Sequence, residues 1–200
     1  MGRPSNRAER RREILTAFKR VVAERGYEGA TIALTAEAAG ILPGLVHYHF
    51  ESKQELLTAL FESLAETIAQ RFQAAKEAQD PGPRAELDAF IDAHLLLGAD
   101  PDETAVAAWV SLSAEALHNE ELRARLSERL GVELSTLEDI VRRILEEEGK
   151  RRTGARAIAA AIYASIQGAF YLGVAAPKLV PRGFASPSVK RWAQRLVDPD

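Results

Sequence analysis

The chain has 200 residues, 46% of them hydrophobic and 28% charged, with a formal net charge of −3 and no cysteine. This composition is that of a soluble globular protein long enough to bury a core, and it excludes disulfides, thiolate catalysis and cysteine-based zinc sites. No apolar run reaches the roughly 18 residues of a membrane span, and no apolar leader follows Met1. We therefore expect a cytoplasmic protein with no membrane partner.

The charge is unevenly distributed along the chain. Residues 1–60 carry a net charge of +2, and residues 61–200 carry −5. Five arginines, including Arg3 and Arg7, fall within the first twelve positions. Such a terminus is either a solubilising tail or a basic arm that contacts an anionic partner.

Apolar residues recur at helical spacing almost throughout, without the alternation of a strand, which predicts an all-α fold. The first helix covers about 8–25 and ends at Gly26. A second begins after Thr31 as N-cap and ends at Gly40, and a short third begins at Pro43. A fourth follows the capping box Ser52-Lys-Gln-Glu55 and runs to about residue 78.

The breaker Asp80-Pro-Gly-Pro83 is the best internal boundary of the chain. Beyond it we predict helices at about 84–98, 102–118, 120–130, 132–148, 155–175 and 187–197. Because Gly131 interrupts an otherwise helical pattern, 120–148 is either one helix or two.

The segment from the second helix to the third has the pattern of a helix-turn-helix. Val46 and Phe50 are four residues apart and are expected to point inward. The opposite face of the short helix then presents side chains able to reach base edges in a major groove: Pro43, Gly44, Leu45, His47 and Tyr48. The N-terminus of the next helix, at Lys53, offers backbone N–H groups to a phosphate.

These residues also carry a resemblance. Over residues 10–60 the chain resembles the tetracycline-repressor (TetR/AcrR) family of bacterial regulators in Thr31, Ala36, Gly40-Ile41, Gly44, Tyr48-His49-Phe50, Ser52-Lys53 and Leu56-Leu57. The resemblance implies an N-terminal three-helix DNA-binding domain, residues 1–52, joined by a long helix to a larger helical effector-binding and dimerisation domain, residues 53–200. Trp109 to Leu122 also resembles the ligand-binding half of the betaine-regulator branch.

Carried over residue by residue, the family pattern makes Thr31, His49 and Lys53 phosphate contacts. It makes Pro43, Gly44, Leu45, His47 and Tyr48 the reading surface, and it likens the segment with Arg3 and Arg7 to an arm along the minor groove. Three positions depart from the pattern. Leu42 replaces the usual Ser or Thr, His47 replaces the usual Tyr, and Thr35 replaces an aliphatic core residue. Leu45 and Pro43 are suited to pack on thymine methyl groups.

The second half offers polar and aromatic candidates for an effector pocket, although helical aromatic stripes are more often core. They are His94, Trp109, Ser113, His118, Tyr163, Gln167, Phe170 and Tyr171. The family dimerises through two late helices, which here correspond to about 132–148 and 155–175.

The sequence contains no motif typical of an enzyme, and we expect no catalytic residue, metal or cofactor. His47 and His49 are two residues apart on a helix and therefore point in different directions, which disfavours chelation. We expect a homodimeric DNA-binding regulator, a repressor released from a palindromic operator by an unknown small-molecule effector. The alternative is a helical protein-interaction module or small-ligand carrier with the same fold and no DNA binding.

Overall fold

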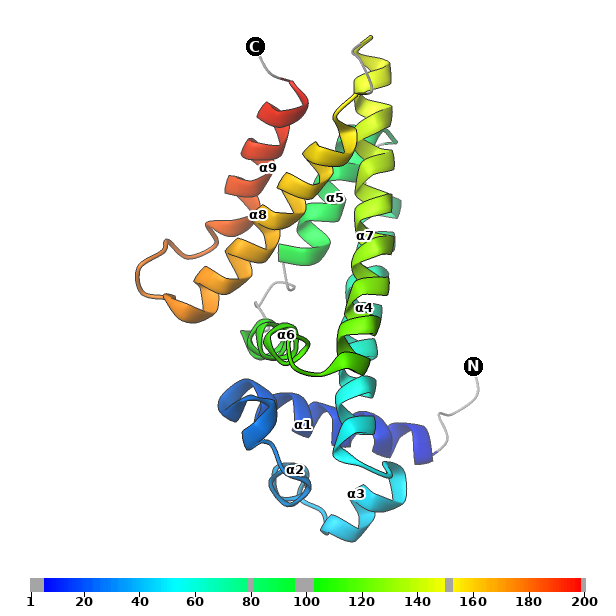
Figure 1. Ribbon diagram of the computed structural model, residues 1–200, viewed down its shortest axis with the longest axis vertical. Helices are drawn as coiled ribbons and strands as arrows, with labels where there is room; N and C mark the ends of the chain where they lie inside the picture. Colours follow the sequence, from blue (N-terminus) through cyan, green and yellow to red (C-terminus); the bar gives the residue numbers. More distant parts are fainter. Residues whose placement is uncertain (1–5, 79–80, 96–102, 150–152, 199–200) are drawn as a thin grey trace. The chain divides into compact units, whose positions relative to one another are not determined.

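The computed structural model describes residues 6–78, 81–95, 103–149 and 153–198 (Figure 1). Within these ranges the chain forms helices and no strand, which confirms the all-α prediction. The helices are α1 (Asn6–Gly29), α2 (Ile32–Ala39), α3 (Pro43–His49), α4 (Lys53–Ala78), α5 (Pro83–Leu95), α6 (Glu103–Glu115), α7 (Glu120–Glu147), α8 (Ala155–Ala175) and α9 (Ala185–Val197).

The chain packs as two compact units. The first unit joins residues 1–66 to residues 103–123, and the second joins 67–102 to 124–200. Helices α4 and α7 each run without interruption from one unit into the other. Because these units are defined by packing, they differ from the functional division between residues 52 and 53, which stays a prediction.

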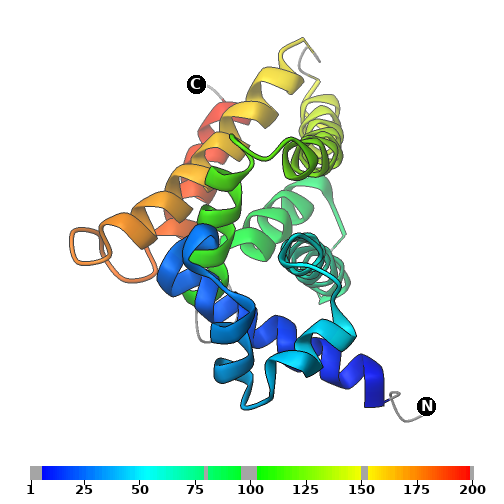
Figure 2. The same ribbon diagram turned by 60° about the horizontal axis from the view of Figure 1, so that its bottom comes forward.

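In the first unit, α1 packs against α2, α3 and α6 (Figure 2). Its inner stripe of Ile14, Phe18 and Val22 is fully buried, as the helical spacing predicts. The rings of Phe61 on α4 and Trp109 on α6 stack with their centroids 5.7 Å apart. Burial of these large side chains is the main stabilising contribution in this unit.

In the second unit, α5, α8 and α9 pack against one another around an apolar core. Helix α8 is long and apolar enough to cross a membrane on composition alone. Its inner face, however, carries Ile162, Ile166 and Phe170 into this core. The apolar character of α8 is therefore explained in part by its packing within the unit.

Several helix ends differ from the sequence prediction. Helix α1 starts at Asn6, and its helical geometry breaks at Gly26, which has φ 69° and ψ 172°, values that favour glycine. Helix α6 ends at Glu115, three residues early, because a turn follows and Asn119 then caps the next helix, accepting a 3.0 Å hydrogen bond from the Leu122 N–H. Helix α9 begins at Ala185, two residues early, and α5 ends at Leu95, with 96–102 outside the described residues.

The structure resolves the ambiguity at Gly131 in favour of one helix. Gly131 is exposed, and a side chain there would meet nothing within 4 Å. The glycine costs only about 1 kcal/mol of helix propensity. Beyond it, a stripe of apolar side chains is almost completely buried: Leu137, Ile140 and Ile144. The free energy gained by burying them exceeds the cost of the glycine.

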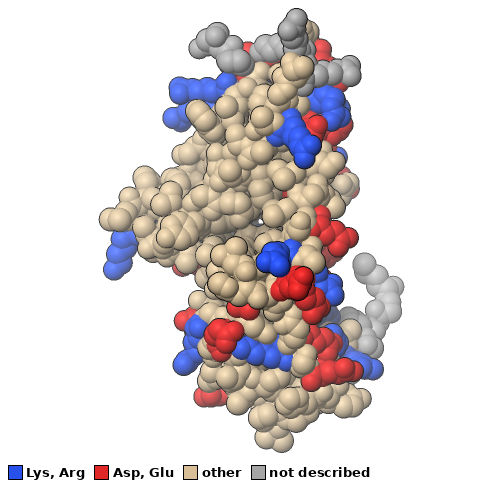
Figure 3. All heavy atoms as spheres, in the orientation of Figure 1, with Lys and Arg blue, Asp and Glu red and all other residues tan. Residues whose placement is uncertain are grey.

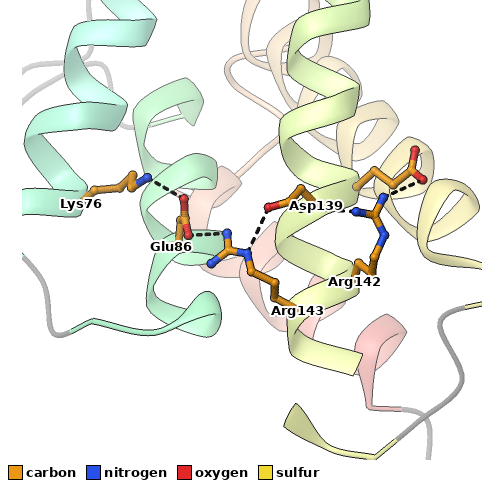
Figure 4. Close-up of polar contacts among 6 residues, drawn as sticks. Lys76, Glu86, Asp139, Arg142 and Arg143 are labelled. Atoms are coloured by element: carbon orange, nitrogen blue, oxygen red, sulfur yellow. Dashed lines mark hydrogen bonds and ion pairs between the residues drawn. The ribbon is translucent and has the colours of Figure 1, made fainter. Parts of the chain in front are cut away.

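A chain of ion pairs connects three helices of the second unit (Figure 4). Glu86 of α5 accepts from Lys76 of α4 at 2.7 Å and from Arg143 of α7 at 2.5 Å. Arg143 also contacts Asp139 at 3.0 Å. Burial alone would raise the pKa of the Glu86 carboxyl, but its hydrogen bonds to Lys76 and Arg143 hold the pKa below its ordinary value.

We expect Glu86→Gln to lower the free energy of unfolding by about 1–2 kcal/mol at pH 7, because both cationic partners are solvated and only the carboxylate is mostly buried. Since the folded-state pKa lies below the ordinary 4.5, this stabilisation is complete above about pH 5 and disappears as the pH falls through the folded value. Urea unfolding of both proteins between pH 7 and pH 3 measures it. A difference that stays constant over the whole range contradicts the ion-pair explanation.

Candidate nucleic-acid interface

The turn between α2 and α3 is fixed by backbone hydrogen bonds and one glycine. Thr31 caps α2, its hydroxyl accepting from the Leu34 N–H at 3.1 Å, as predicted. Gly40 ends α2 in the left-handed conformation at φ 66°, and the Ile41 N–H reaches back to the Ala36 carbonyl at 3.0 Å. This is the helix-turn-helix geometry that the sequence predicts.

Helix α3 has a buried face and an exposed face. Val46 and Phe50 are 0% and 1% exposed, which agrees with their predicted inward orientation. Pro43, Gly44, His47 and Tyr48 are exposed and Leu45 is half-buried. The side chains expected to face DNA therefore lie on the solvent side of this helix.

Arg11 of α1 holds the C-terminal end of α3 from behind. Its guanidinium lies 4.0 Å from the centre of the Phe50 ring, donates to the His49 carbonyl and pairs with Glu55 at 3.1 Å. Arg11 is one of the five N-terminal arginines for which the sequence predicts only a solubilising tail or a basic arm. The only signal is its spacing, because Arg11, Ile14 and Phe18 share one face of α1.

The N-terminus of α4 forms one of the two hydrogen bonds of the predicted capping box. The Ser52 hydroxyl accepts from the Glu55 N–H at 3.1 Å, as in a capping box. The Glu55 carboxylate, however, accepts from the Glu51 N–H at 2.7 Å and not from that of Ser52. Lys53 is half-buried, with its ammonium 4.1 Å from the Tyr27 ring and 3.3 Å from the Glu28 carbonyl oxygen.

Gln54, in the first turn of α4, connects distant segments of the first unit. Its side-chain oxygen accepts from the Tyr27 hydroxyl at 3.3 Å and from the Asn119 amide at 3.0 Å. Its amide nitrogen lies 3.4 Å from a carboxylate oxygen of Glu121. The end of α1 and the beginning of α7 are thereby tied to the start of α4, a role that the local sequence pattern does not reveal.

His49 is buried in the structure, although the family pattern makes it a phosphate contact. The side chain is 6% exposed and its Nδ1 atom makes no hydrogen bond. Burial lowers the pKa of His49, and the nearby Arg7, Arg11 and Arg10 lower it further. The phosphate contact stays a prediction, and the free protein favours the neutral ring.

The remaining DNA-binding candidates have different surroundings. Arg7 is exposed on α1, which is already helical there, whereas Arg3 lies outside the described residues. Thr31 is exposed, with its hydroxyl engaged in the cap of α2. Thr35, unusual for a core position, is fully buried, but its hydroxyl donates to the Thr31 carbonyl at 2.8 Å, which satisfies the polar group.

The predicted pocket residues are divided between the two units. In the first unit Trp109 is buried, Ser113 is half-buried and His118 is exposed. The second unit contains His94, Tyr163, Gln167, Phe170 and Tyr171. Within that unit, His94, Tyr163 and Phe170 are buried and Tyr171 is 62% exposed. That all eight line one pocket stays a prediction.

His94 and Tyr163 belong to a buried polar cluster of the second unit, together with Glu133 and Arg129. His94 Nδ1 donates to the Phe90 carbonyl at 2.8 Å, which leaves Nε2 3.5 Å from Glu133, too far for a good hydrogen bond. Burial would raise the pKa of Glu133, but His94 and the paired Arg129 hold it below its ordinary value. Burial, and then the Glu133 charge, raise the pKa of Tyr163.

Both halves of the chain match known families. Residues 83–198 match the model of the BetI-type transcriptional repressor C-terminal domain, and residues 14–60 match that of the tetR family of bacterial regulatory proteins. The chain belongs to the TetR family. This family consists of transcriptional regulators, not enzymes, in agreement with the sequence prediction.

A curated transcriptional regulator is similar to this chain over part of its length. The HTH-type transcriptional regulator BetI of Rhizobium meliloti (strain 1021) is 34% identical over 117 residues, 58% of this chain. The matched segment spans 57% of that relative's length.

Solved structures show the same fold. A transcriptional regulator from Rhodococcus sp. Rha1 aligns with a TM-score of 0.78 and 20% identity, covering 94% of this chain and 95% of that one. A transcriptional regulator from Saccharomonospora viridis in complex with choline aligns with a TM-score of 0.79 and 21% identity, covering 96% and 97%.

The buried His49 generates a pH-dependence of stability. Because its folded-state pKa lies below the ordinary 6.5, the unfolded chain binds the proton first, and stability falls as the pH drops from about 7 through 6.5 towards the folded value. We expect His49→Gln to flatten this part of the profile, measured by thermal unfolding between pH 7.5 and pH 5. His47→Gln, which alters an exposed ring on the same helix, is the control and should leave the profile unchanged.

Proposed function

We propose that this TetR-family protein is a homodimeric repressor that binds a two-fold symmetric DNA operator through α3. The observation that carries the proposal is the exposed face of α3, presented by a fixed turn and followed directly by the N-terminus of α4. Helix α3 has seven residues, and its outer face packs against no other described part of its unit, since Tyr48 on that face is 70% exposed. A short helix with exposed side chains, followed at once by the N-terminus of a long helix, is suited to a major groove.

The proposed dimer interface lies on α8 and α9. The sequence predicts an interface formed by 132–148, which is the second part of α7, and 155–175, which is α8. That pairing stays a prediction, and we propose α9 in place of 132–148 because exposed apolar side chains gather on α8 and α9. Most of the large exposed apolar side chains of the second unit lie on these helices or between them: Tyr171, Leu172, Val174, Leu179 and Trp192. Figure 3 shows few charged side chains over the middle of α8. Two α3 helices in successive major grooves, about 34 Å apart, would read both halves of an operator.

The proposed effector site is the buried cluster around His94. This cluster places polar groups inside an apolar surrounding. The polar groups are an ionised Glu133 and a His94 nitrogen without a good hydrogen bond, and the Phe90 and Tyr163 rings flank them. An effector that prefers one dimer geometry would shift operator occupancy, and a coupling of about 1–3 kcal/mol is typical. Choline, bound by the Saccharomonospora viridis protein, is the first ligand to test.

DNA binding is tested by selecting duplexes from a random pool with the full-length protein at near-physiological salt, then sequencing. We expect a two-fold related motif with half-sites about one helical turn apart. Tyr48→Ala should weaken binding to the recovered duplex by about tenfold, the loss of one base contact. Lys53→Ala should weaken binding to all sequences and reduce the salt slope by about one.

Leu117→Ala is the matched control, since Leu117 is also 70% exposed but lies outside the helix-turn-helix. It should bind as the wild type does. If no motif is enriched and all variants behave alike, α3 does not read DNA, and the protein-interaction alternative takes its place. A single half-site without symmetry would contradict the dimer.

Effector binding is tested by thermal unfolding in the presence of choline and then of a panel of small metabolites. We expect a ligand that raises the unfolding midpoint and weakens operator binding. His94→Phe, which keeps a buried ring, should abolish both effects. Leu117→Ala alters an exposed side chain of the first unit that belongs to no predicted site, and it should preserve them. An unchanged response in His94→Phe would place the effector elsewhere.

A further inference from the structure

Leu42 is an apolar side chain without an evident structural partner. It is the N-cap of α3, with φ −78° and ψ 144°, and no side-chain hydrogen bond caps the helix. The Leu42 side chain is also 79% exposed, so most of its apolar surface is in water immediately before the reading helix. A Ser or Thr here would cap the helix and expose less apolar surface, so Leu42 is unfavourable on both counts.

The local fold does not require this leucine. The turn is fixed by Gly40 and by the Ile41 hydrogen bond to Ala36. The first turn of α3 is fixed by Pro43 and by the 2.9 Å hydrogen bond from the Leu45 N–H to the Leu42 carbonyl. Because the acceptor is a backbone carbonyl, any residue at position 42 could form this bond. The exposed Leu42 side chain is therefore free to contact a ligand of the helix-turn-helix.

We propose that Leu42 reads the C5 methyl group of a thymine in each half-site. This inference rests on the proposed DNA binding and names the chemistry of its specificity. The N-terminal residues of a reading helix are those that meet base edges, and the thymine methyl is the apolar feature of the major groove. The neighbouring exposed surface, Pro43 and Gly44, is also uncharged, and in Figure 3 the α2–α3 end of the first unit carries few charged side chains.

The methyl group is isolated by replacing thymine with deoxyuridine. This change removes one methyl and preserves base pairing, the other groove atoms and the phosphates. The probe is the duplex recovered by selection, resynthesised with deoxyuridine at each thymine in turn, and its affinity for the full-length protein is measured. At one thymine per half-site we expect a loss of about fourfold, the contribution of one buried carbon group.

Three variants assign the effect to Leu42. Leu42→Ala and Leu42→Ser should bind the thymine and deoxyuridine duplexes within twofold of each other, whereas Leu117→Ala should keep the fourfold difference. Leu42→Ser has no methyl group, and its hydroxyl supplies the side-chain cap that α3 lacks, which favours folding. Thermal unfolding of each variant confirms the fold.

The outcomes separate the inference from the function on which it rests. Failure of the wild type to enrich any motif overturns the proposed function and this inference with it. A motif that is enriched but unaffected by deoxyuridine at every position overturns the inference alone. A deoxyuridine effect that persists in Leu42→Ala assigns the methyl contact to another residue and also overturns it.

Discussion

A helix of seven residues cannot be stable by itself in water, and everything proposed for α3 depends on what holds it in place. Its buried face is fixed by Val46 and Phe50, and its end is held by the Arg11 guanidinium stacked on Phe50 and bound to the His49 carbonyl. These stabilising contacts therefore lie on one side of the helix. The other side is exposed, and in the proposed function its side chains contact DNA.

The local features of this site were readable from the sequence because each depends on neighbouring residues. A hydroxyl at Thr31, a left-handed Gly40 and an inward pair at Val46 and Phe50 follow from spacing and residue type alone. The contacts of Arg11 and Gln54 join residues 27 to 67 positions apart, and no local pattern encodes them. The arginines at the N-terminus predict either a solubilising tail or a basic arm, although Arg11 makes structural contacts with Phe50 and the His49 carbonyl.

The second half was less predictable for the same reason. Helical spacing located α5, α8 and α9 to within a few residues, yet it could not determine whether the buried stripe of α7 would carry the helix past Gly131. Nor could it show which aromatic residues share a packed unit. Trp109 stacks on Phe61 in the first unit, whereas Tyr163 lies 5.9 Å from the His94 ring in the second.

The first packed unit is not a continuous piece of chain, since residues 103–123 complete what residues 1–66 begin. A cut at any single point between the first turn of α4 and the start of α6 would remove α6 from α1 and leave Gln54 without Asn119. Chimeras that exchange DNA-binding domains between relatives therefore need two crossover segments to preserve this core. For the DNA-binding function that we propose, specificity is therefore easier to change by substitution on the outer face of α3 than by exchange of whole domains.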